Sequence, residues 1–174
     1  MAFKIGQKIV YPNHGVGIVE KIEDGELADT RHTFYHLRLL TNESKVMVPK
    51  ENLDLIGLRP LCQKADIKRL FKLLGNGDID TYKDWKGRYK QNLEKMKTGM
   101  LEDVAEVLKN LRLVSQKKSL SFREKKMYER AKHFIVIEVC HVQNVDQAAA
   151  EKKVEKALDT SIQKREQGIE EAVG

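Results

Sequence analysis

The 174-residue chain is predicted to be an α+β protein in which a small SH3-like or Tudor-like β-barrel, residues 1–59, precedes an all-α helical domain, residues 60–174. Two observations predict this. Short alternating apolar runs bounded by turn residues fill the first third of the chain, which is typical of a small barrel. From Cys62 onward, apolar residues recur at helical spacing instead. The sequence therefore predicts two domains of different structural class.

Turn residues separate four expected strands in the barrel. The first strand ends at residues 12–15, where Pro12 fixes φ and Gly15 allows a positive φ. The dipeptide Asp24-Gly25 follows the second strand as a hairpin signal, and a tight turn at residues 41–43 follows the third. The four strands are expected at residues 3–11, 15–23, 33–40 and 44–49.

Capping signals place the helices of the second domain. Thr81 with Asp84, and Ser121 with Glu124, have the spacing of a capping box, so helices are expected to begin there. Gly99 is the expected end of the first of these helices. Apolar residues at helical spacing predict further helices along residues 67–74, along residues 101–111 and from residue 146, the last fraying past Gly168.

Positive charge is concentrated in the middle of the chain. Residues 60–142 hold 19 Lys and Arg against 11 Asp and Glu, whereas residues 1–59 hold 8 of each. The terminal segment, residues 143–174, is slightly acidic, with 5 Lys and Arg against 7 Asp and Glu. A localised basic surplus is typical of a protein that binds a polyanion, and the neutral first domain suggests a different partner.

The only tryptophan, Trp85, stands among three lysines and an arginine in residues 81–90. The expected apolar stripe of this helix is Tyr82, Trp85, Tyr89, Leu93 and Met96, with Lys83, Lys86, Lys90 and Lys97 along one side. One interpretation is an exposed ring that contacts DNA. The other is a large core residue on a helix whose lysines are solvated, and spacing alone favours this second interpretation.

Motifs for catalysis and metal binding are not found in the sequence. The chain has no phosphate-binding loop, no glycine-rich dinucleotide motif and no HExxH, GxSxG or CxxC, so we expect neither an enzyme nor a cofactor. His32 and His36 can share a strand face, and His133 precedes Cys140-His141, but such histidines are more often structural than ligands. We therefore expect no metal site.

The sequence also bears on location. Cys62 and Cys140 are far apart in the chain, which fits a reducing compartment. No apolar run approaches eighteen residues and no charged-then-apolar leader opens the chain, so neither a membrane span nor a signal peptide is expected. We expect a cytoplasmic monomer with no membrane partner.

Several motifs resemble a known family. Residues 8–17, KIVYPNHGVG, with residues 46–49 and 57–59, resemble the polymerase-interacting domain shared by the CarD/CdnL transcription regulators and the transcription-repair coupling factor, while helicase motifs are absent. Trp85 with Arg88-Tyr89-Lys90, and residues 120–127, LSFREKKM, resemble the CarD/CdnL helical domain. The resemblance covers nearly everything up to about residue 142.

This resemblance implies a function. In the family, the amino-terminal domain docks on the β subunit of bacterial RNA polymerase. The helical domain contacts promoter DNA at the upstream edge of the melting bubble, where a tryptophan wedges into the minor groove. We therefore expect a nucleoid-associated regulator that stabilises the open complex. Its expected DNA contacts are Trp85, Lys86, Arg88, Lys90, Lys125 and Lys126, and its expected polymerase-binding edge strand is Lys45, Val46, Met47, Val48 and Pro49.

Three positions depart from the family pattern. Many members have a basic residue where this chain has Gly87, and the adjacent Lys86 is expected to substitute for it. Some members have arginines on the polymerase-facing surface where Gly25 and Met47 stand, so those contacts do not carry over. Two rival interpretations remain open: a protein-interaction adaptor with a peptide-reading barrel and no DNA role, and a nucleic-acid chaperone that binds any duplex.

Overall fold

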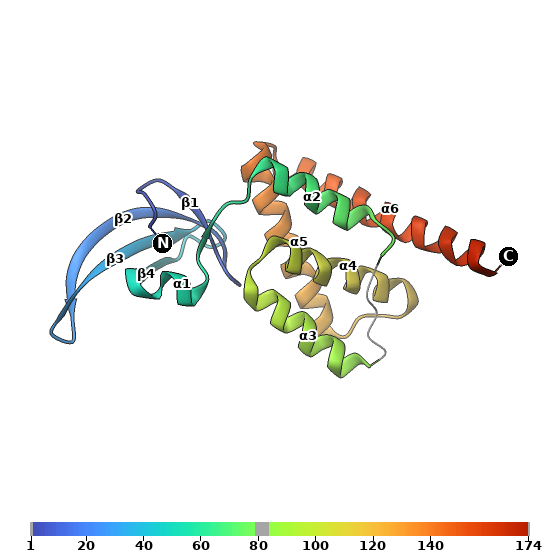
Figure 1. The fold of residues 1–174 in the computed structure, drawn as a ribbon, viewed down its shortest axis with the longest axis horizontal. Helices are drawn as coiled ribbons and strands as arrows, with labels where there is room; N and C mark the ends of the chain where they lie inside the picture. The colour runs from blue at the N-terminus through green and yellow to red at the C-terminus, as the bar shows by residue number, and fades with distance from the viewer. Residues whose placement is uncertain (1, 79–83, 174) are drawn as a thin grey trace. The chain divides into compact units, whose positions relative to one another are not determined.

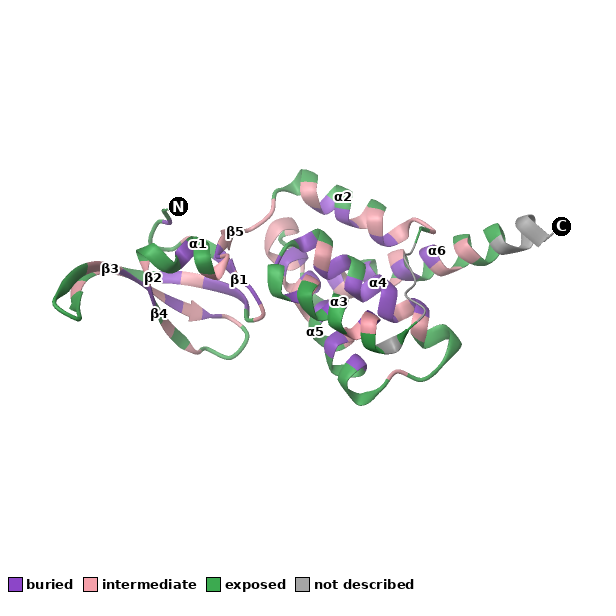
Figure 2. Ribbon diagram, turned by 60° about the horizontal axis from the view of Figure 1, so that its bottom comes forward, coloured by how far each residue is buried: buried purple, intermediate pink, exposed green. Residues whose placement is uncertain are grey.

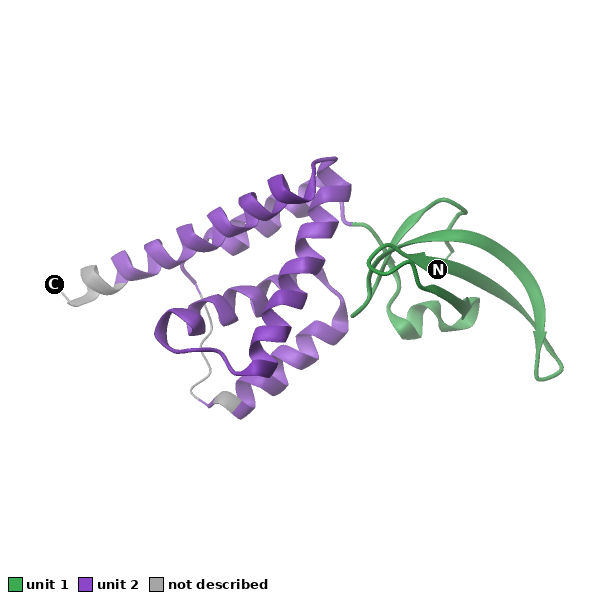
Figure 3. Ribbon diagram, turned by 180° about the vertical axis from the view of Figure 1, so that it is seen from behind, with its two compact units in different colours: residues 1–61 green, residues 62–174 purple. Residues whose placement is uncertain are grey.

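The chain divides between Leu61 and Cys62 into two units, residues 1–61 and 62–174 (Figure 3). The computed structural model describes residues 2–78 and 84–173, and it leaves aside the side chains of residues 85 and 169–173. The sequence placed the boundary after residue 59. The difference arises because Arg59 and Pro60 form a short strand that pairs with the first strand of the sheet.

The first unit is built on a five-stranded antiparallel sheet (Figure 1). Its strands are β1 (Lys8–Tyr11), β2 (Gly15–Leu27), β3 (Thr30–Leu39), β4 (Lys45–Pro49) and β5 (Arg59–Pro60), in the spatial order β4-β3-β2-β1-β5. A 3-10 turn, Lys50–Asn52, and a short helix, α1 (Leu53–Ile56), connect β4 to β5. The core consists of Phe3, Ile9, Val19, Tyr35, Leu37, Val48, Leu53 and Leu58.

The hairpin of β2 and β3 is longer than the sequence predicted. Asp24 and Gly25 lie within its ladder, so the predicted turn at these residues is wrong. The ring of Phe34 gives a reason for the glycine, because a Cβ at residue 25 would lie 3.1 Å from that ring. The turn is instead Ala28-Asp29, where both residues have a positive φ, as in a type I′ turn.

The second unit is helical, which confirms the predicted α+β class. Within the described residues its helices are α2 (Lys64–Gly75), α3 (Trp85–Thr98), α4 (Leu101–Lys117), α5 (Phe122–Gln143) and α6 (Gln147–Val173). Helix α4 is central, since every residue from 107 to 111 is buried (Figure 2). Leu108 and Leu111 of α4 pack in one core with Leu70, Ile135 and Leu158, which come from α2, α5 and α6.

Two of the predicted helix ends are confirmed. Ser121 caps α5 with both hydrogen bonds of the capping box, and Gly99 ends α3 in the left-handed conformation, with a φ of 66°. Helix α6 continues to Val173, beyond Gly168, where the sequence predicts fraying. Within residues 2–78 and 84–173, no helix is long and apolar enough to cross a membrane, and no group of three His, Cys, Asp or Glu side chains could hold a metal ion.

Candidate nucleic-acid interface

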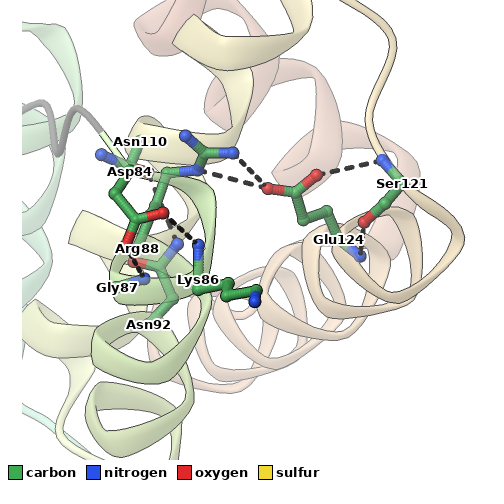
Figure 4. A network of polar contacts seen from close by, with 8 residues as sticks. All are labelled: Asp84, Lys86, Gly87, Arg88, Asn92, Asn110, Ser121 and Glu124. Atoms are coloured by element: carbon green, nitrogen blue, oxygen red, sulfur yellow. Dashed lines mark hydrogen bonds and ion pairs between the residues drawn. The ribbon is translucent and has the colours of Figure 1, made fainter.

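The helix that carries Trp85 begins at that residue. Asp84 is the N-cap of α3, and its carboxylate accepts hydrogen bonds from the backbone N–H groups of Lys86, at 3.1 Å, and Gly87, at 2.9 Å (Figure 4). The predicted helix start at Thr81 is therefore wrong, because Asp84 itself is the cap. Thr81 and the Trp85 side chain lie outside the described part of the structure.

Gly87 has a structural reason in this cap. A Cβ built at residue 87 would lie 3.2 Å from Oδ2 of Asp84, which is closer than most real Cβ contacts. A longer residue at this position would require the Asp84 carboxylate to shift by a few tenths of an ångström. The glycine that departs from the family pattern therefore fits the start of α3.

A buried ion pair joins the first turns of α3 and α5. Arg88 Nη2 lies 2.6 Å from Glu124 Oε1, and both side chains are only 5% exposed (Figure 4). Glu124 Oε2 also accepts the backbone N–H of Ser121 at 3.0 Å. Burial raises the pKa of Glu124, but the hydrogen bonds from Arg88 and Ser121 outweigh burial and hold that pKa below its ordinary value. Arg88 therefore acts as the counter-ion of a buried carboxylate.

The buried side of α3 differs from the predicted apolar stripe. Arg88, Asn92 and Met96 are buried, whereas Leu93, a member of the predicted apolar stripe, is 37% exposed. Asn92 Nδ2 donates to Oδ1 of Asn110 on α4 at 3.4 Å. Polar pairs thus contribute much of the contact between α3 and its neighbours, and an apolar pattern could not reveal them.

Exposed cations lie on α3 and α5 near the start of each helix. They are Lys86 and Lys90 on α3, and Arg123, Lys125 and Lys126 on α5. The two nearby acids are already bonded within the protein, since Asp84 caps α3 and Glu124 pairs with Arg88. The structure therefore leaves four of the expected DNA contacts exposed on α3 and α5: Lys86, Lys90, Lys125 and Lys126. A fifth expected contact, Arg88, is buried, with 4% of its surface exposed. The sixth is Trp85, whose side chain is not described.

One residue of this surface, Phe122, was missed by sequence reasoning. It is the first residue of α5 and is 72% exposed, and Nζ of Lys126 lies 4.6 Å from the centre of its ring. A signal existed, because Met127 faces the core and Phe122 lies about 140° from it around the helix. An exposed aromatic ring among cations has the chemistry to stack on an unpaired base.

The expected polymerase-binding strand, β4, lies at an edge of its sheet. It pairs with β3, and among the described residues no strand pairs with its other side. Leu39 donates its N–H to the Ser44 carbonyl, so by alternation the N–H of Val46 faces β3 and the N–H of Met47 points outward. Met47 is 57% exposed, whereas Val48 is buried in the core.

Two family models match the chain. Residues 3–62 match the CarD-like/TRCF RID domain, and residues 69–155 match the CarD C-terminal domain. The chain belongs to the CarD family. CarD-family proteins are transcription factors rather than enzymes, so the expectation that this chain is not an enzyme is confirmed.

The chain is also similar to individual proteins. A protein of Bacillus subtilis (strain 168) named "Putative transcription factor YdeB" is 35% identical over 137 residues, covering 79% of this chain and 90% of the relative. The solution NMR structure of the 72-residue N-terminal domain of Myxococcus xanthus CarD is 36% identical and covers 33% of this chain and 77% of that domain, with a TM-score of 0.30. The structure of CdnLNt from Myxococcus xanthus is 42% identical, and the match covers 37% of this chain and 90% of that one, with a TM-score of 0.32.

Proposed function

We propose that this CarD-family protein docks on the β subunit of bacterial RNA polymerase and stabilises the promoter open complex by binding DNA at the upstream edge of the bubble. One observation carries the DNA half of the proposal. The Arg88–Glu124 pair fixes the start of the Trp85 helix beside the start of α5, and both helices carry exposed cations, with an exposed Phe122 at the start of α5.

The chemistry of this surface favours recognition of an opened DNA structure rather than of a DNA sequence. Lysine contacts to phosphates are blind to sequence, and they supply affinity for any duplex. A ring that wedges between bases must unstack them at a cost of a few kcal/mol, which is smallest where the duplex is already open. Trp85 as the wedge would therefore prefer the fork, and we assign Lys86, Lys90, Lys125 and Lys126 to the phosphates around it.

Arg88 has a different role in this proposal. Its guanidinium is bonded to Glu124 and is nearly excluded from solvent, so a phosphate could reach it only if the buried pair opened. That would leave a carboxylate buried without its counter-ion, which is costly. We therefore assign Arg88 to positioning the two helix starts and omit it from the phosphate contacts.

The sheet supplies a route to the polymerase. An extended segment of the partner can add to the free edge of β4, with backbone hydrogen bonds at Lys45 and Met47 giving affinity. Docking then raises the effective concentration of the helical unit at the promoter, so promoter choice comes from the polymerase. We place the protein in the cytoplasm with the transcription machinery.

The lifetime of promoter open complexes tests the proposal in the full chain. Stacking on an opened base is worth about 1 to 3 kcal/mol, so Trp85→Ala should shorten that lifetime by roughly five- to 150-fold. Its melting temperature and polymerase binding should stay near those of the wild type. Leu93→Ala, on an exposed part of the same helix, is the matched control. It should leave the open-complex lifetime, the melting temperature and polymerase binding near those of the wild type.

The alternatives give different results. If Trp85 belongs to the core, Trp85→Ala will lose about 3 to 5 kcal/mol of stability and its DNA effect will track only the folded fraction. If the protein is an adaptor without a DNA role, it will still capture polymerase, but the lifetime of promoter open complexes will be the same with and without the protein. A stand-alone chaperone would bind duplex DNA equally well with and without polymerase.

A further inference from the structure

A groove of about 590 Å³ lies between α2 and α6, at the end of the helical unit where α5 finishes. Four lysines line it: Lys72 on α2, and Lys153, Lys156 and Lys164 on α6. Its described lining contains no Asp or Glu. The volume falls in the range of small-molecule sites, which is about 300 to 1,000 Å³.

Three acids of α6 form ion pairs with the neighbouring helices α4 and α5. Glu151 and Glu155 lie 3.1 Å and 3.5 Å from Nζ of Lys132 on α5, and Asp159 lies 2.6 Å from Arg112 on α4. These three acids recur four residues apart and so occupy one face of α6. Their charges are compensated by Lys132 and Arg112, which are not among the residues that line the groove.

The described acids do not pair with the groove lysines. Among the residues that the structure describes, no acid forms an ion pair with Lys72, Lys156 or Lys164, and Lys153 is bonded only to the neutral amide of Gln143, at 2.9 Å. From Lys153 to Lys164 the charges span about 16 Å along α6. Positive charge spread over that length suits a ligand with several negative charges.

The floor between these lysines is apolar and preformed. Phe71, Gly75 and Ala157 line it, and a Cβ at Gly75 would lie 3.8 Å from the Ala157 carbonyl oxygen, so α2 and α6 approach closely there. Lys109 fixes the end of α2 by donating to the Leu73 carbonyl at 2.8 Å. A floor of small and aromatic residues suits a planar ring.

We propose that this groove binds a nucleoside polyphosphate, with the base on the apolar floor and the phosphates among the lysines. The side-chain amide oxygens of Asn76 and Gln143 accept hydrogen bonds from Lys109 and Lys153, and their NH2 groups can donate to the base edge. The site is separate from the DNA surface, because α5 extends about 33 Å from Phe122 to Gln143. An acidic protein partner fits less well, because stable protein interfaces bury about 800 Å² per partner, far more than this groove offers.

Calorimetric titration of the full-length protein with ATP, GTP, inorganic triphosphate and adenosine tests this site. At least one nucleotide should bind saturably, one per chain, and roughly tenfold or more tightly than either fragment, because only the nucleotide uses both the floor and the lysines. The double variant Lys153→Ala/Lys156→Ala should weaken nucleotide binding about tenfold or more.

Two control variants locate the site. Lys152→Ala changes an exposed lysine of α6 outside the groove lining and should leave nucleotide binding within about twofold of the wild type. Lys86→Ala/Lys90→Ala should weaken DNA binding and spare nucleotide binding, so the two proposals fail independently. The groove proposal is overturned if no nucleotide binds saturably, or if inorganic triphosphate binds as tightly as the nucleotides. It is also overturned if polyglutamate binds and nucleotides do not, or if nucleotide binding is lost in the Lys86/Lys90 variant but not in the groove variant.

Discussion

Removing Arg88 should destabilise the helical unit rather than merely weaken DNA binding. Arg88 and Glu124 are each 5% exposed, and removing one partner of such a buried pair typically costs about 3 to 5 kcal/mol, because the other charge is left without compensation. For a unit of this size, each kcal/mol lowers the melting temperature by roughly 4 °C. Arg88→Met should therefore melt roughly 12 to 20 °C below the wild type.

A double-mutant cycle separates the pair from its surroundings. Replacing a buried ion pair by apolar residues of similar volume is often neutral, so Arg88→Met/Glu124→Leu should recover most of the lost stability. Full recovery is not expected, because Glu124 also completes the capping box with Ser121. The four proteins are compared by thermal and urea unfolding followed by circular dichroism.

The opposite outcome would restore the expectation drawn from sequence. If Arg88→Met melts within about 2 °C of the wild type, a buried pair does not hold the helix starts together. If the same variant also flattens the salt dependence of DNA binding by about one unit, Arg88 contacts a phosphate.

Three further outcomes are expected. Lys90→Ala should flatten the slope of log K against log[salt] by about 0.9, from about −3.6 for four phosphate contacts, and an unchanged slope would return this lysine to the solvated surface. The pKa of Glu124 in the folded protein lies below its ordinary value of 4.5, so the stabilisation by its carboxylate is complete above the unfolded pKa and is lost as pH falls through the folded pKa. The difference in unfolding free energy between the wild type and Glu124→Gln should therefore narrow below about pH 4. A difference that stays constant down to about pH 2 would contradict this. Met47→Pro removes an outward N–H of β4 and should abolish polymerase capture in a pull-down, whereas Met47→Ala should retain it; equal capture by both would exclude this edge.

The sequence predicted those parts of the fold that depend on local pattern. The change of apolar period near Cys62 indicates the change from sheet to helices, and the capping box at Ser121 marks the start of α5 correctly. The hairpin turn was missed because Asp24-Gly25 has the stronger local signal, whereas Ala28-Asp29 has none. A glycine required by a ring on the neighbouring strand looks the same in sequence as a glycine required by a turn.

The site was harder to predict than the fold because it depends on a contact between residues far apart in the chain. Lys86, Lys90 and Lys125 could be proposed from charge and resemblance, and all three are exposed. The burial of Arg88 depends on Glu124, which is 36 residues away, and nothing local reports that pairing. In both α3 and α5 the charged residues have the pattern of a solvated helix face, although Arg88 in α3 and Glu124 in α5 are buried.

The polar contacts of α3 also determine which alignment of that helix against its neighbours is allowed. A purely apolar face can slide by one turn along a groove and remain buried, because apolar contact is not directional. A slide of α3 would break both the Arg88–Glu124 pair and the Asn92–Asn110 hydrogen bond, and it would leave their partners buried and unsatisfied. Such a penalty for every wrong alignment is how buried polar groups specify a unique structure in some helical assemblies. In this protein the penalty would fix the first residue of α3, Trp85, at one position along the axis of the helical bundle.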